Sequence, residues 1–322
     1  MSYDVIGDIH GQADKLEALL TRLGYRHRTD GWCHPGRIAV FVGDFIDRGP
    51  HQVRTMNLVR RIVEAGFARS VMGNHELNAM AWHTPDPAQA GEYLRPRFSE
   101  EYGATNRQQH ARFLAEVEHL ASEHAPLIDW FRTLPLWLDL EGIRVVHACW
   151  HGPFMDWLQR SHLGDGRTLS ETLLVPATRE PADEAEKDNA EPSVFKAVEA
   201  LTKGIEIPLP EGHAFRDKDG HERRRVRVRW WDAKASTYRT AAMLSESERE
   251  CLPDTEMPAH ARIGTGDRKR VFFGHYWLTG QPAILSPHAA CVDYSAGKGG
   301  ALVAYRWDGE SALTNQHFVS VG

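Results

Sequence analysis

Hydrophobic positions in the first 80 residues follow two alternating periods. Short apolar runs of the kind found in β-strands occupy residues 3–6, 37–42 and 69–72. Between these runs, apolar residues recur at helical spacing over residues 12–23 and 53–65. The alternation predicts a βαβαβ unit with right-handed crossovers and largely parallel strands. In sheets of this kind, functional sites form beyond the carboxyl ends of the strands.

The pattern becomes mainly helical over residues 86–137. The clearest helical spacing lies at residues 107–120 and 126–134, and a strand is predicted at residues 143–147. Residues 171–192 are polar and acidic, a composition that is typical of a solvated loop. The middle of the chain is therefore expected to hold helices first, then one strand, then a loop.

Strand patterns return in the last part of the chain. Residues 224–231 alternate between apolar residues on one face and Arg225, Arg227 and Arg229 on the other, which predicts a half-buried strand. Such a row of arginines is more often a solvated face than a contact for phosphates. Three more predicted strands, which we expect to close a second sheet, lie at residues 269–273, 289–292 and 301–306.

No internal repeat divides the chain. We expect a single catalytic domain over residues 1–322, with a helical insertion at about residues 86–137 and a second insertion at about residues 171–262. Insertions of this size are expected to form the walls of the site and to carry its specificity.

The composition is that of an ordinary globular protein, with 42% hydrophobic and 25% charged residues. No apolar run approaches the roughly 18 residues that span a bilayer, so no membrane contact is expected. The N-terminus lacks a positively charged region before its apolar run, so a secretory signal is not expected either. The net charge of −6 gives no overall attraction to nucleic acid or anionic lipid. Four cysteines without a CxxC pair are typical of reduced thiols, which predicts a cytoplasmic protein.

Short polar motifs follow the first two predicted strands. GDIHG carries Asp8 and His10. In an extended chain, positions i and i+2 point the same way, so these two side chains can share one cation. GDFIDRG carries Asp44, whose two carboxylate oxygens allow it to bridge two cations.

Three further candidate ligands come from motifs farther along the chain. Asn74 of GNHE provides an amide oxygen, while His147 at the end of IRVVH and His275 of GHYW provide imidazoles. With three nitrogen and three oxygen ligands, the set suits Mn²⁺, Fe or Zn²⁺ better than Mg²⁺ or Ca²⁺. We therefore expect two divalent or trivalent metal ions, most readily Mn²⁺, that can hold a hydroxide and polarise a phosphate.

The motifs GDIHG, GDFIDRG and GNHE, in this order and followed by a strand histidine and a GH pair, resemble one branch of the calcineurin-like metallophosphoesterases. This is the phosphoprotein-phosphatase branch, which includes Ser/Thr protein phosphatases, bacterial diadenosine tetraphosphatases and the phosphatase module of polynucleotide kinase-phosphatases. The resemblance covers residues 3–77, 131–147 and 271–306. It implies an α/β fold in which a four-layer β-sandwich is flanked by helices.

The resemblance also implies roles for single residues. It assigns the six candidate ligands to one binuclear metal site: Asp8, His10, Asp44, Asn74, His147 and His275. Asp44 bridges the two metals, and Asn74 also contacts the substrate. His75 is the general acid for the leaving oxygen, Asp47 pairs with it, and Arg48 binds the phosphate. The implied reaction is hydrolysis of a phosphate ester by direct in-line attack of a metal-bound hydroxide.

The sequence departs from the family pattern around the expected substrate pocket. The family often has two glycines after the residue equivalent to His147, whereas this chain has Ala-Cys-Trp ending at Trp150. Tyr294 lies in a second stretch, VDYSAGKGG, that differs from the family pattern. Two further residues are candidate substrate contacts, Arg239 and Tyr276. Many members of the family have a second phosphate-binding arginine, and Arg239 is a candidate for that role.

A phosphorylated substrate is expected, and two substrate classes fit the sequence: a Ser/Thr phosphoprotein or a dinucleoside polyphosphate. Aromatic residues near GHYW mildly favour the second. The alternative is a phosphatase or phosphodiesterase for nucleotides or nucleic-acid ends. Of these, the net charge of −6 mildly disfavours nucleic-acid ends. A non-catalytic metal- or phosphate-binding module is a remote alternative, because neither the ligands nor the acid is missing. The sequence makes no prediction about the oligomeric state.

Overall fold

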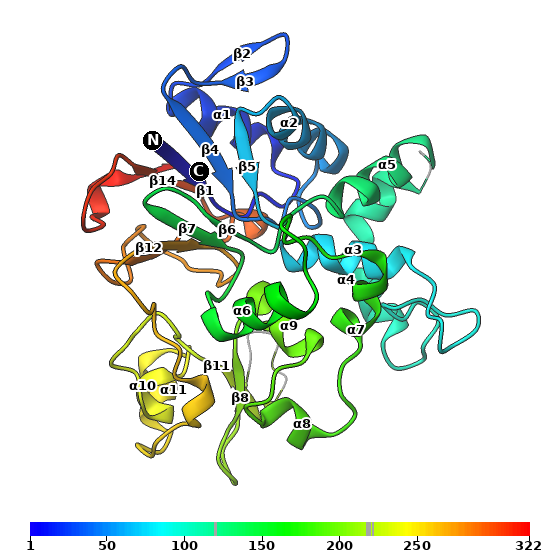
Figure 1. Ribbon diagram of the computed structural model, residues 1–322, viewed down its shortest axis with the longest axis vertical. Helices are drawn as coiled ribbons and strands as arrows, with labels where there is room; N and C mark the ends of the chain where they lie inside the picture. Colours follow the sequence, from blue (N-terminus) through cyan, green and yellow to red (C-terminus); the bar gives the residue numbers. More distant parts are fainter. Residues whose placement is uncertain (119–120, 217–219, 221) are drawn as a thin grey trace.

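Apolar strands form the centre of the molecule, and helices cover them on both sides. The computed structural model describes residues 1–118, 121–216, 220 and 222–322. Two β-sheets pack face to face, and helices cover the outer face of each sheet (Figure 1). This arrangement confirms the expected α/β class with a layered β-sandwich flanked by helices.

The first sheet has the strand order β15-β14-β1-β4-β5. Its strands are β1 (Ser2–Ile6), β4 (Arg37–Phe41), β5 (Ala68–Ser70), β14 (Leu302–Trp307) and β15 (Phe318–Val321). β1, β4 and β5 run parallel, as predicted, whereas β14 pairs antiparallel with β1 and β15. The expectation that residues 301–306 help to close the second sheet was therefore wrong. Residue periodicity indicates a strand but does not encode its neighbours.

The second sheet has the strand order β13-β12-β7-β6. Its strands are β6 (Trp137–Asp139), β7 (Ile143–Val146), β12 (Arg270–Phe273) and β13 (Ala289–Cys291). β7, β12 and β13 run parallel, and β6 joins the edge antiparallel to β7. Side chains from both sheets share one apolar cluster between them, in which Val5 and Val40 meet Val145 and Phe272. The strand ends of both sheets are held in place by this packing.

Amphipathic helices cover the sheets. α1 (Ala13–Arg22) and α2 (Gln52–Glu64) lie beside β4 and β5, while α6 (Gly152–Ser161) and α9 (Val194–Lys203) lie beyond the second sheet (Figure 1). Leu16, Leu19 and Leu20 of α1 are buried, as their helical spacing predicts. The helices expected at residues 12–23 and 53–65 are confirmed to within about two residues.

The region expected to be helical at residues 86–137 contains α4 (Gly103–Val117) and α5 (Ala121–Phe131), and α3 (Asn74–His83) precedes it. The end of the helix predicted at residues 107–120 lies outside the described residues. A hairpin of β2 (Arg26–Arg28) and β3 (Gly31–Cys33) was not expected. Short 3₁₀ helices occur at η1 (Ala259–Ala261), η2 (Ala296–Lys298) and η3 (Asn315–His317).

The acidic segment at residues 171–192 is not a plain loop. It contains α7 (Glu171–Thr178) and α8 (Glu184–Asp188). The Ser170 hydroxyl accepts the Leu173 amide and caps α7, whose Leu174 is buried. The prediction of a loop rested on the acidic composition of the whole segment, which does not reveal the short apolar face of α7.

The remaining elements lie around a small apolar cluster of their own below the second sheet (Figure 1). They are β8 (Glu206–Pro208), β9 (Phe215–Arg216), β10 (Glu222–Arg223), β11 (Arg225–Arg227), α10 (Tyr238–Ala241) and α11 (Glu246–Glu250). β11 is shorter than the strand predicted at residues 224–231, but Val226, Val228 and Trp230 are all buried, as predicted. Among the described residues, no helix has the length and apolar character that crossing a bilayer requires.

A buried carboxylate connects three neighbouring strands of the first sheet. Asp4 of β1 is fully buried. Its oxygens accept from Arg37 Nε of β4 at 3.0 Å and from Arg306 Nε of β14 at 3.1 Å. Removing the buried negative charge of Asp4 would leave the positive charges of both arginines without their partner.

We expect Asp4→Ala to lower the free energy of unfolding by about 3 kcal/mol, because two guanidinium groups lose their buried partner. Asp129→Ala is the matched control, since Asp129 forms an exposed pair with Arg132. Its loss should cost less than about 1 kcal/mol. Urea unfolding of the two variants checks this, and equal losses would contradict it.

Candidate active site

Loops that follow strands of both sheets meet at one place. β1, β4, β5, β7 and β12 all end there, and the loops after them carry buried side chains with oxygen or nitrogen lone pairs. The structure brings together all six candidate ligands, each of them buried: Asp8, His10, Asp44, Asn74, His147 and His275.

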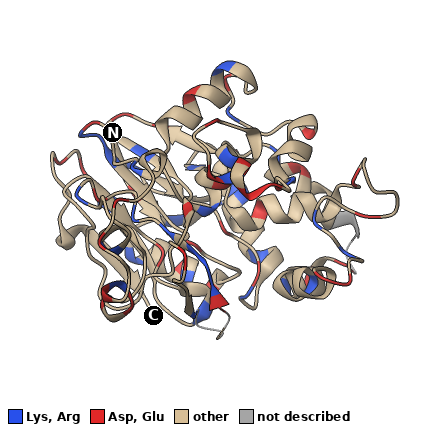
Figure 2. Ribbon diagram, turned by 90° about the horizontal axis from the view of Figure 1, so that it is seen from below, with Lys and Arg blue, Asp and Glu red and all other residues tan. Residues whose placement is uncertain are grey.

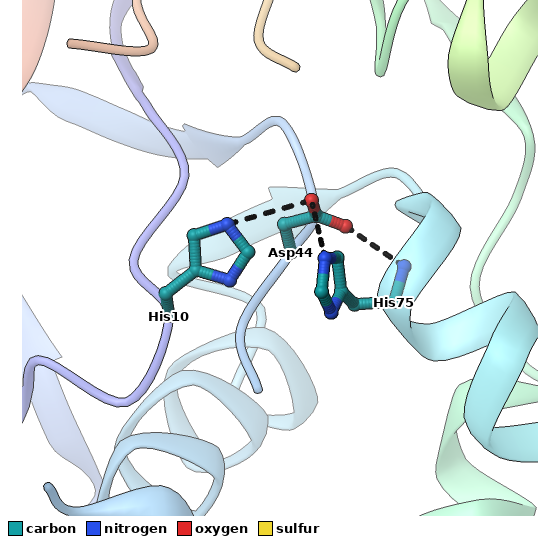
Figure 3. Close-up of side chains that lie close together, drawn as sticks. All are labelled: His10, Asp44 and His75. Carbon is teal, nitrogen blue, oxygen red and sulfur yellow. Dashed lines mark hydrogen bonds and ion pairs between the residues drawn. The ribbon is translucent and has the colours of Figure 1, made fainter. Parts of the chain in front are cut away.

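The carboxylate of Asp44 lies at the centre of this group. Its Oδ2 is 3.6 Å from His10 Nε2 and 3.4 Å from His147 Nε2. Oδ1 accepts the backbone amide of His75 at 3.0 Å. Figure 3 shows the Asp44 carboxylate between the rings of His10 and His75. One carboxylate thus faces side chains from both sheets.

Asn74 and Asp8 complete the opposite side. Asn74 Oδ1 lies 2.8 Å from His275 Nδ1 and 3.1 Å from His147 Nε2. Asp8 Oδ2 accepts the backbone amide of His275 at 3.0 Å. Residues separated by 267 positions in sequence are therefore in direct contact.

Two of the imidazoles are oriented by backbone carbonyl groups. His10 Nδ1 donates to the Ile46 carbonyl at 2.8 Å, and His147 Nδ1 donates to the Val42 carbonyl at 2.7 Å. With Nδ1 as the donor, Nε2 of each ring is directed at the centre of the site, where a cation can take the place of a proton. Metal-binding histidines commonly have their second nitrogen held in this way.

The donor set fits two cations. Lone-pair atoms of His10, Asp44 and His75 lie within 4.8 Å of one another, and so do those of Asp44, His147 and His275. His75 is in the first group because it lies beside Asp44, although the expected ligand there is Asp8. Among the described residues, Asp8 Oδ1, His10 Nε2 and His275 Nε2 are buried without a hydrogen-bond partner. A buried acceptor without a donor is costly unless a proton or a cation lies beside it.

The pKa values of the buried histidines also indicate that the site favours bound cations. Burial, together with the nearby His75, lowers the pKa of His10 to about 3, so its imidazole is in the neutral form that binds metals. Burial disfavours the charged form of His147, but the Asp44 carboxylate outweighs it and raises the pKa of His147 to about 10. The buried carboxylates thus draw positive charge to this place.

The extended backbone that we expected to place Asp8 and His10 on the same side is not present at His10. His10 has a φ of 47°, and Asp44 and His275 also have left-handed backbones with φ of 54° and 71°. These side chains converge because their loops turn sharply. At Gly274, a Cβ atom would lie 1.9 Å from Asp8 Oδ1, so only glycine allows these two loops to come so close.

His75 and Asp47 form a second unit beside the ligand group. His75 Nδ1 lies 2.5 Å from Asp47 Oδ2, and Arg48 Nη2 lies 3.4 Å from His75 Nε2. Burial would lower the pKa of His75, but the charge of Asp44 and the hydrogen bond to Asp47 raise it above its ordinary value. An imidazole with a raised pKa can donate a proton.

Arg48 lies against an aromatic side chain of the GHYW motif, Trp277. The guanidinium carbon of Arg48 is 3.4 Å from the centre of the Trp277 ring, and Lys298 Nζ is 4.9 Å from the same centre. The Trp277 amide donates to Asp293 Oδ2 at 2.7 Å, which fixes the loop beneath the ring. The GHYW motif was the available signal for Trp277.

Glu76 fixes the loops around Asp44. Its buried carboxylate accepts the amides of Asp44, Phe45 and Gly73 at 2.8–3.0 Å. Burial, with the charge of Asp44, raises the pKa of Glu76 to about 7. The residue acts on the backbone and not on the centre of the site.

Two candidate substrate contacts have other partners. Tyr276 is buried, and its hydroxyl lies 3.1 Å from Trp230 Nε1. Arg239 Nε donates to the Leu252 carbonyl at 3.0 Å within the second insertion. Contact of either residue with a substrate stays a prediction.

The bulky residues that break the family pattern are also packed. Trp150 lies beneath the Arg144 guanidinium at 4.9 Å, and the Tyr294 hydroxyl accepts the Ala283 amide at 2.8 Å.

Sequence reasoning missed His110. Its Nδ1 lies 2.8 Å from Asp47 Oδ1, and the side chain is buried. The histidine belongs to α4, in the region expected to be a helical insertion. No motif surrounds it, so only its position in space marks it.

Comparison with known proteins agrees with this arrangement. A family model described as calcineurin-like phosphoesterase matches residues 1–231. The asymmetrical bis(5'-nucleosyl)-tetraphosphatase PrpE of Halalkalibacterium halodurans is 34% identical over 145 residues, which are 45% of this chain and 58% of that protein. PrpE of Bacillus subtilis is 43% identical over 76 residues, which are 23% of this chain and 31% of that protein. The chain thus matches little more than half the length of the first relative and about a third of the second.

Solved phosphatase structures are also similar. The protein serine/threonine phosphatase of Saccharomyces cerevisiae gives a TM-score of 0.44 at 14% identity, over 99% of this chain and 79% of that chain. The cold-active protein-tyrosine phosphatase of a Shewanella species gives 0.44 at 15% identity, over 100% and 80%.

We expect Glu76→Ala to weaken binding of Mn²⁺ about tenfold or more, because Asp44 and its loop lose their shared acceptor. Glu92→Ala is the matched control, since Glu92 is also buried and accepts the amides of Tyr93 and Arg97 in a loop outside the site. Both variants should lose stability, but only Glu76→Ala should lose cation affinity. Calorimetric titration with Mn²⁺ checks this, and equal affinities in the two variants would contradict it.

Proposed function

The chain belongs to the calcineurin-like phosphoesterase family, and on that premise we propose that it is a metal-dependent phosphoric ester hydrolase. The observation that carries the proposal is the buried carboxylate of Asp44, whose Oδ2 faces His10 Nε2 on one side and His147 Nε2 on the other. A shared carboxylate between two sets of imidazoles is suited to a pair of cations. Such a pair is useful for hydrolysis because it acts on the attacking and the leaving oxygen together.

Six residues would hold the cations: Asp8, His10, Asp44, Asn74, His147 and His275. When bound, two cations would supply Lewis acidity for the phosphate and lower the pKa of water at the site. Mn²⁺ is the preferred choice, with Fe and Zn²⁺ as alternatives, because imidazoles and carboxylates are combined.

His75 would donate the proton that the leaving oxygen needs. Asp47 holds the Nδ1 side of its ring at 2.5 Å, which leaves Nε2 directed at the site. The raised pKa of His75 favours the protonated ring before the reaction.

Arg48 would bind the phosphate. Its Nη1 is buried without a hydrogen-bond partner among the described residues, while the ring of Trp277 supports the flat face of the guanidinium. A guanidinium held in this way can donate two parallel hydrogen bonds to phosphate oxygens.

Among substrates, we favour a dinucleoside polyphosphate, with a Ser/Thr phosphoprotein as the second class. The similar PrpE proteins are bis(5'-nucleosyl)-tetraphosphatases. Arg48 and the exposed Lys298 also lie near the same ring, that of Trp277. Two neighbouring positively charged side chains suit a chain of several phosphates better than a single phosphate.

The nucleic-acid alternative has less support. Arg225 is paired with Asp188, Arg227 with Glu206, and Arg229 with Asp232. Arginines that are already paired make a weak phosphate track. Acidic and basic segments are interspersed over the ribbon (Figure 2). A non-catalytic binding module is also less favoured, because the proton donor and the ligands occur together.

We also propose that residues 1–322 form one catalytic domain with insertions at about 86–137 and 171–262. Residue Trp230 of the second insertion supports this, since its Nε1 donates to the Ala148 carbonyl at 3.1 Å, one residue after His147. A cytoplasmic location is proposed from the four cysteines, all of which are free thiols.

The chain should hydrolyse 4-nitrophenyl phosphate when Mn²⁺ is added, and Asp44→Asn should lose both activity and metal. Removing the shared charge weakens both cation positions, so metal analysis should fall below two equivalents. Asp129→Asn, an exposed substitution, is the control. Absence of turnover by the unchanged protein with any divalent metal would overturn the proposed function, and two full equivalents in Asp44→Asn would overturn the bridging role.

Lys298→Ala should raise KM for diadenosine tetraphosphate about tenfold, because a charge-assisted contact to a distal phosphate is lost. It should leave KM for 4-nitrophenyl phosphate nearly unchanged, and Lys234→Ala, an exposed lysine of the second insertion, should change neither. Steady-state kinetics with both substrates and with a phosphoserine peptide measure this. Equal changes on all substrates would argue against a polyphosphate substrate.

A further inference from the structure

We propose that His110 is a positioning residue that holds Asp47 in the orientation that His75 requires. The two oxygens of Asp47 have different partners. Oδ2 lies 2.5 Å from His75 Nδ1, and Oδ1 lies 2.8 Å from His110 Nδ1. The carboxylate is therefore held between two imidazoles, one in the site and one outside it. The inference rests on the proposed proton donation by His75.

Asp47 needs such support because its backbone is strained. Its φ is 70°, and the next residue, Arg48, also has a φ of 70°. Non-glycine residues adopt this region only where surrounding contacts over-determine it. The Asp47 amide donates to Gln52 Oε1 at 2.6 Å, which holds the backbone. His110 supplies the corresponding contact for the side chain.

His110 is itself rigidly placed. It is 3% exposed, and its ring packs on Phe113 with centres 4.9 Å apart. Glu116, on the same helix α4, accepts the amides of Gln52 and Val53 at 2.7 and 2.9 Å. A carboxylate at the start of α2 is favourable because it satisfies free amide groups. α4 is thus docked on the loop that carries Asp47 at two points.

The charge of Asp47 depends on this contact. Burial would raise the pKa of Asp47, but the charge and hydrogen bond of His110, and then those of His75, lower it below its ordinary value. An ionised Asp47 orients the His75 ring by accepting from its Nδ1 at 2.5 Å. Without His110, one oxygen of a buried carboxylate would have no donor.

Three variants and two substrates test the proposal. His110→Phe keeps the ring and its packing but removes the donor. His110→Asn restores a donor, since its amide nitrogen can occupy the place of Nδ1. His124→Phe is the matched control, because His124 packs on Phe113 at 5.8 Å but makes no hydrogen bond to Asp47. The substrates are phenyl phosphate, which has a poor leaving group, and 4-nitrophenyl phosphate, which has a good one.

We expect His110→Phe to lower kcat on phenyl phosphate by about tenfold to hundredfold, in line with other residues that orient a functional group. The loss on 4-nitrophenyl phosphate should be much smaller, because this leaving group needs little help from an acid. His110→Asn should recover most of the difference, and His124→Phe should show none. The ratio of the two substrates within one variant does not depend on how much of the protein is folded.

Equal losses on both substrates, or His110→Asn no better than His110→Phe, would overturn the positioning role. A separate readout does not need activity. The Nδ1 proton of His75 in NMR spectra should shift in His110→Phe and not in His124→Phe, and an unchanged signal would overturn the inference. Lack of turnover by the unchanged protein on every ester would instead overturn the proposed function, and the NMR result would still decide the role of His110.

Discussion

The buried carboxylate of Asp44 is the constraint on which the site depends. A charge removed from water is costly unless several partners compensate it. Asp44 meets this demand with the amide of His75 and with imidazoles that come from both sheets. These partners can reach it only because the two sheets stack with their strand ends at the same place. Assembly of the site therefore depends on packing of the apolar layer between the sheets.

The loops around Asp44 store strain that the surrounding structure holds. His10, Asp44, Asp47, Arg48 and His275 all have left-handed backbones. Each costs free energy that the fold must offset, on the order of 1–3 kcal/mol for such a residue. Glu76 offsets part of it by binding three amides of two loops, and the close contact at Gly274 allows the loops to meet. Strain at this density is typical of functional sites.

The two insertions contact the site in different ways. The first sends α4 to the loop of Asp47 and to the start of α2. The second anchors Trp230 between Ala148 and Tyr276, next to two of the candidate ligands. Its arginines pair with acidic neighbours and so leave the surface without a continuous basic track. Helices and strands far from the motifs therefore support the loops that carry them.

The sequence by itself determined the βαβαβ start, the layered α/β class and the family, because side-chain periodicity and motif order are local properties of the chain. It also named Asp44 and the five other candidate ligands that are buried with it at the strand ends. It did not predict that β14 joins the first sheet, that residues 171–192 form helices or that His10 has a left-handed backbone in place of the extended one that strand alternation requires. Only the tertiary structure decided these points, together with the contact of His110 with Asp47 across 63 residues. The physical reason is that pairing, loop strain and a lone buried histidine depend on neighbours distant in sequence, for which local periodicity carries no signal.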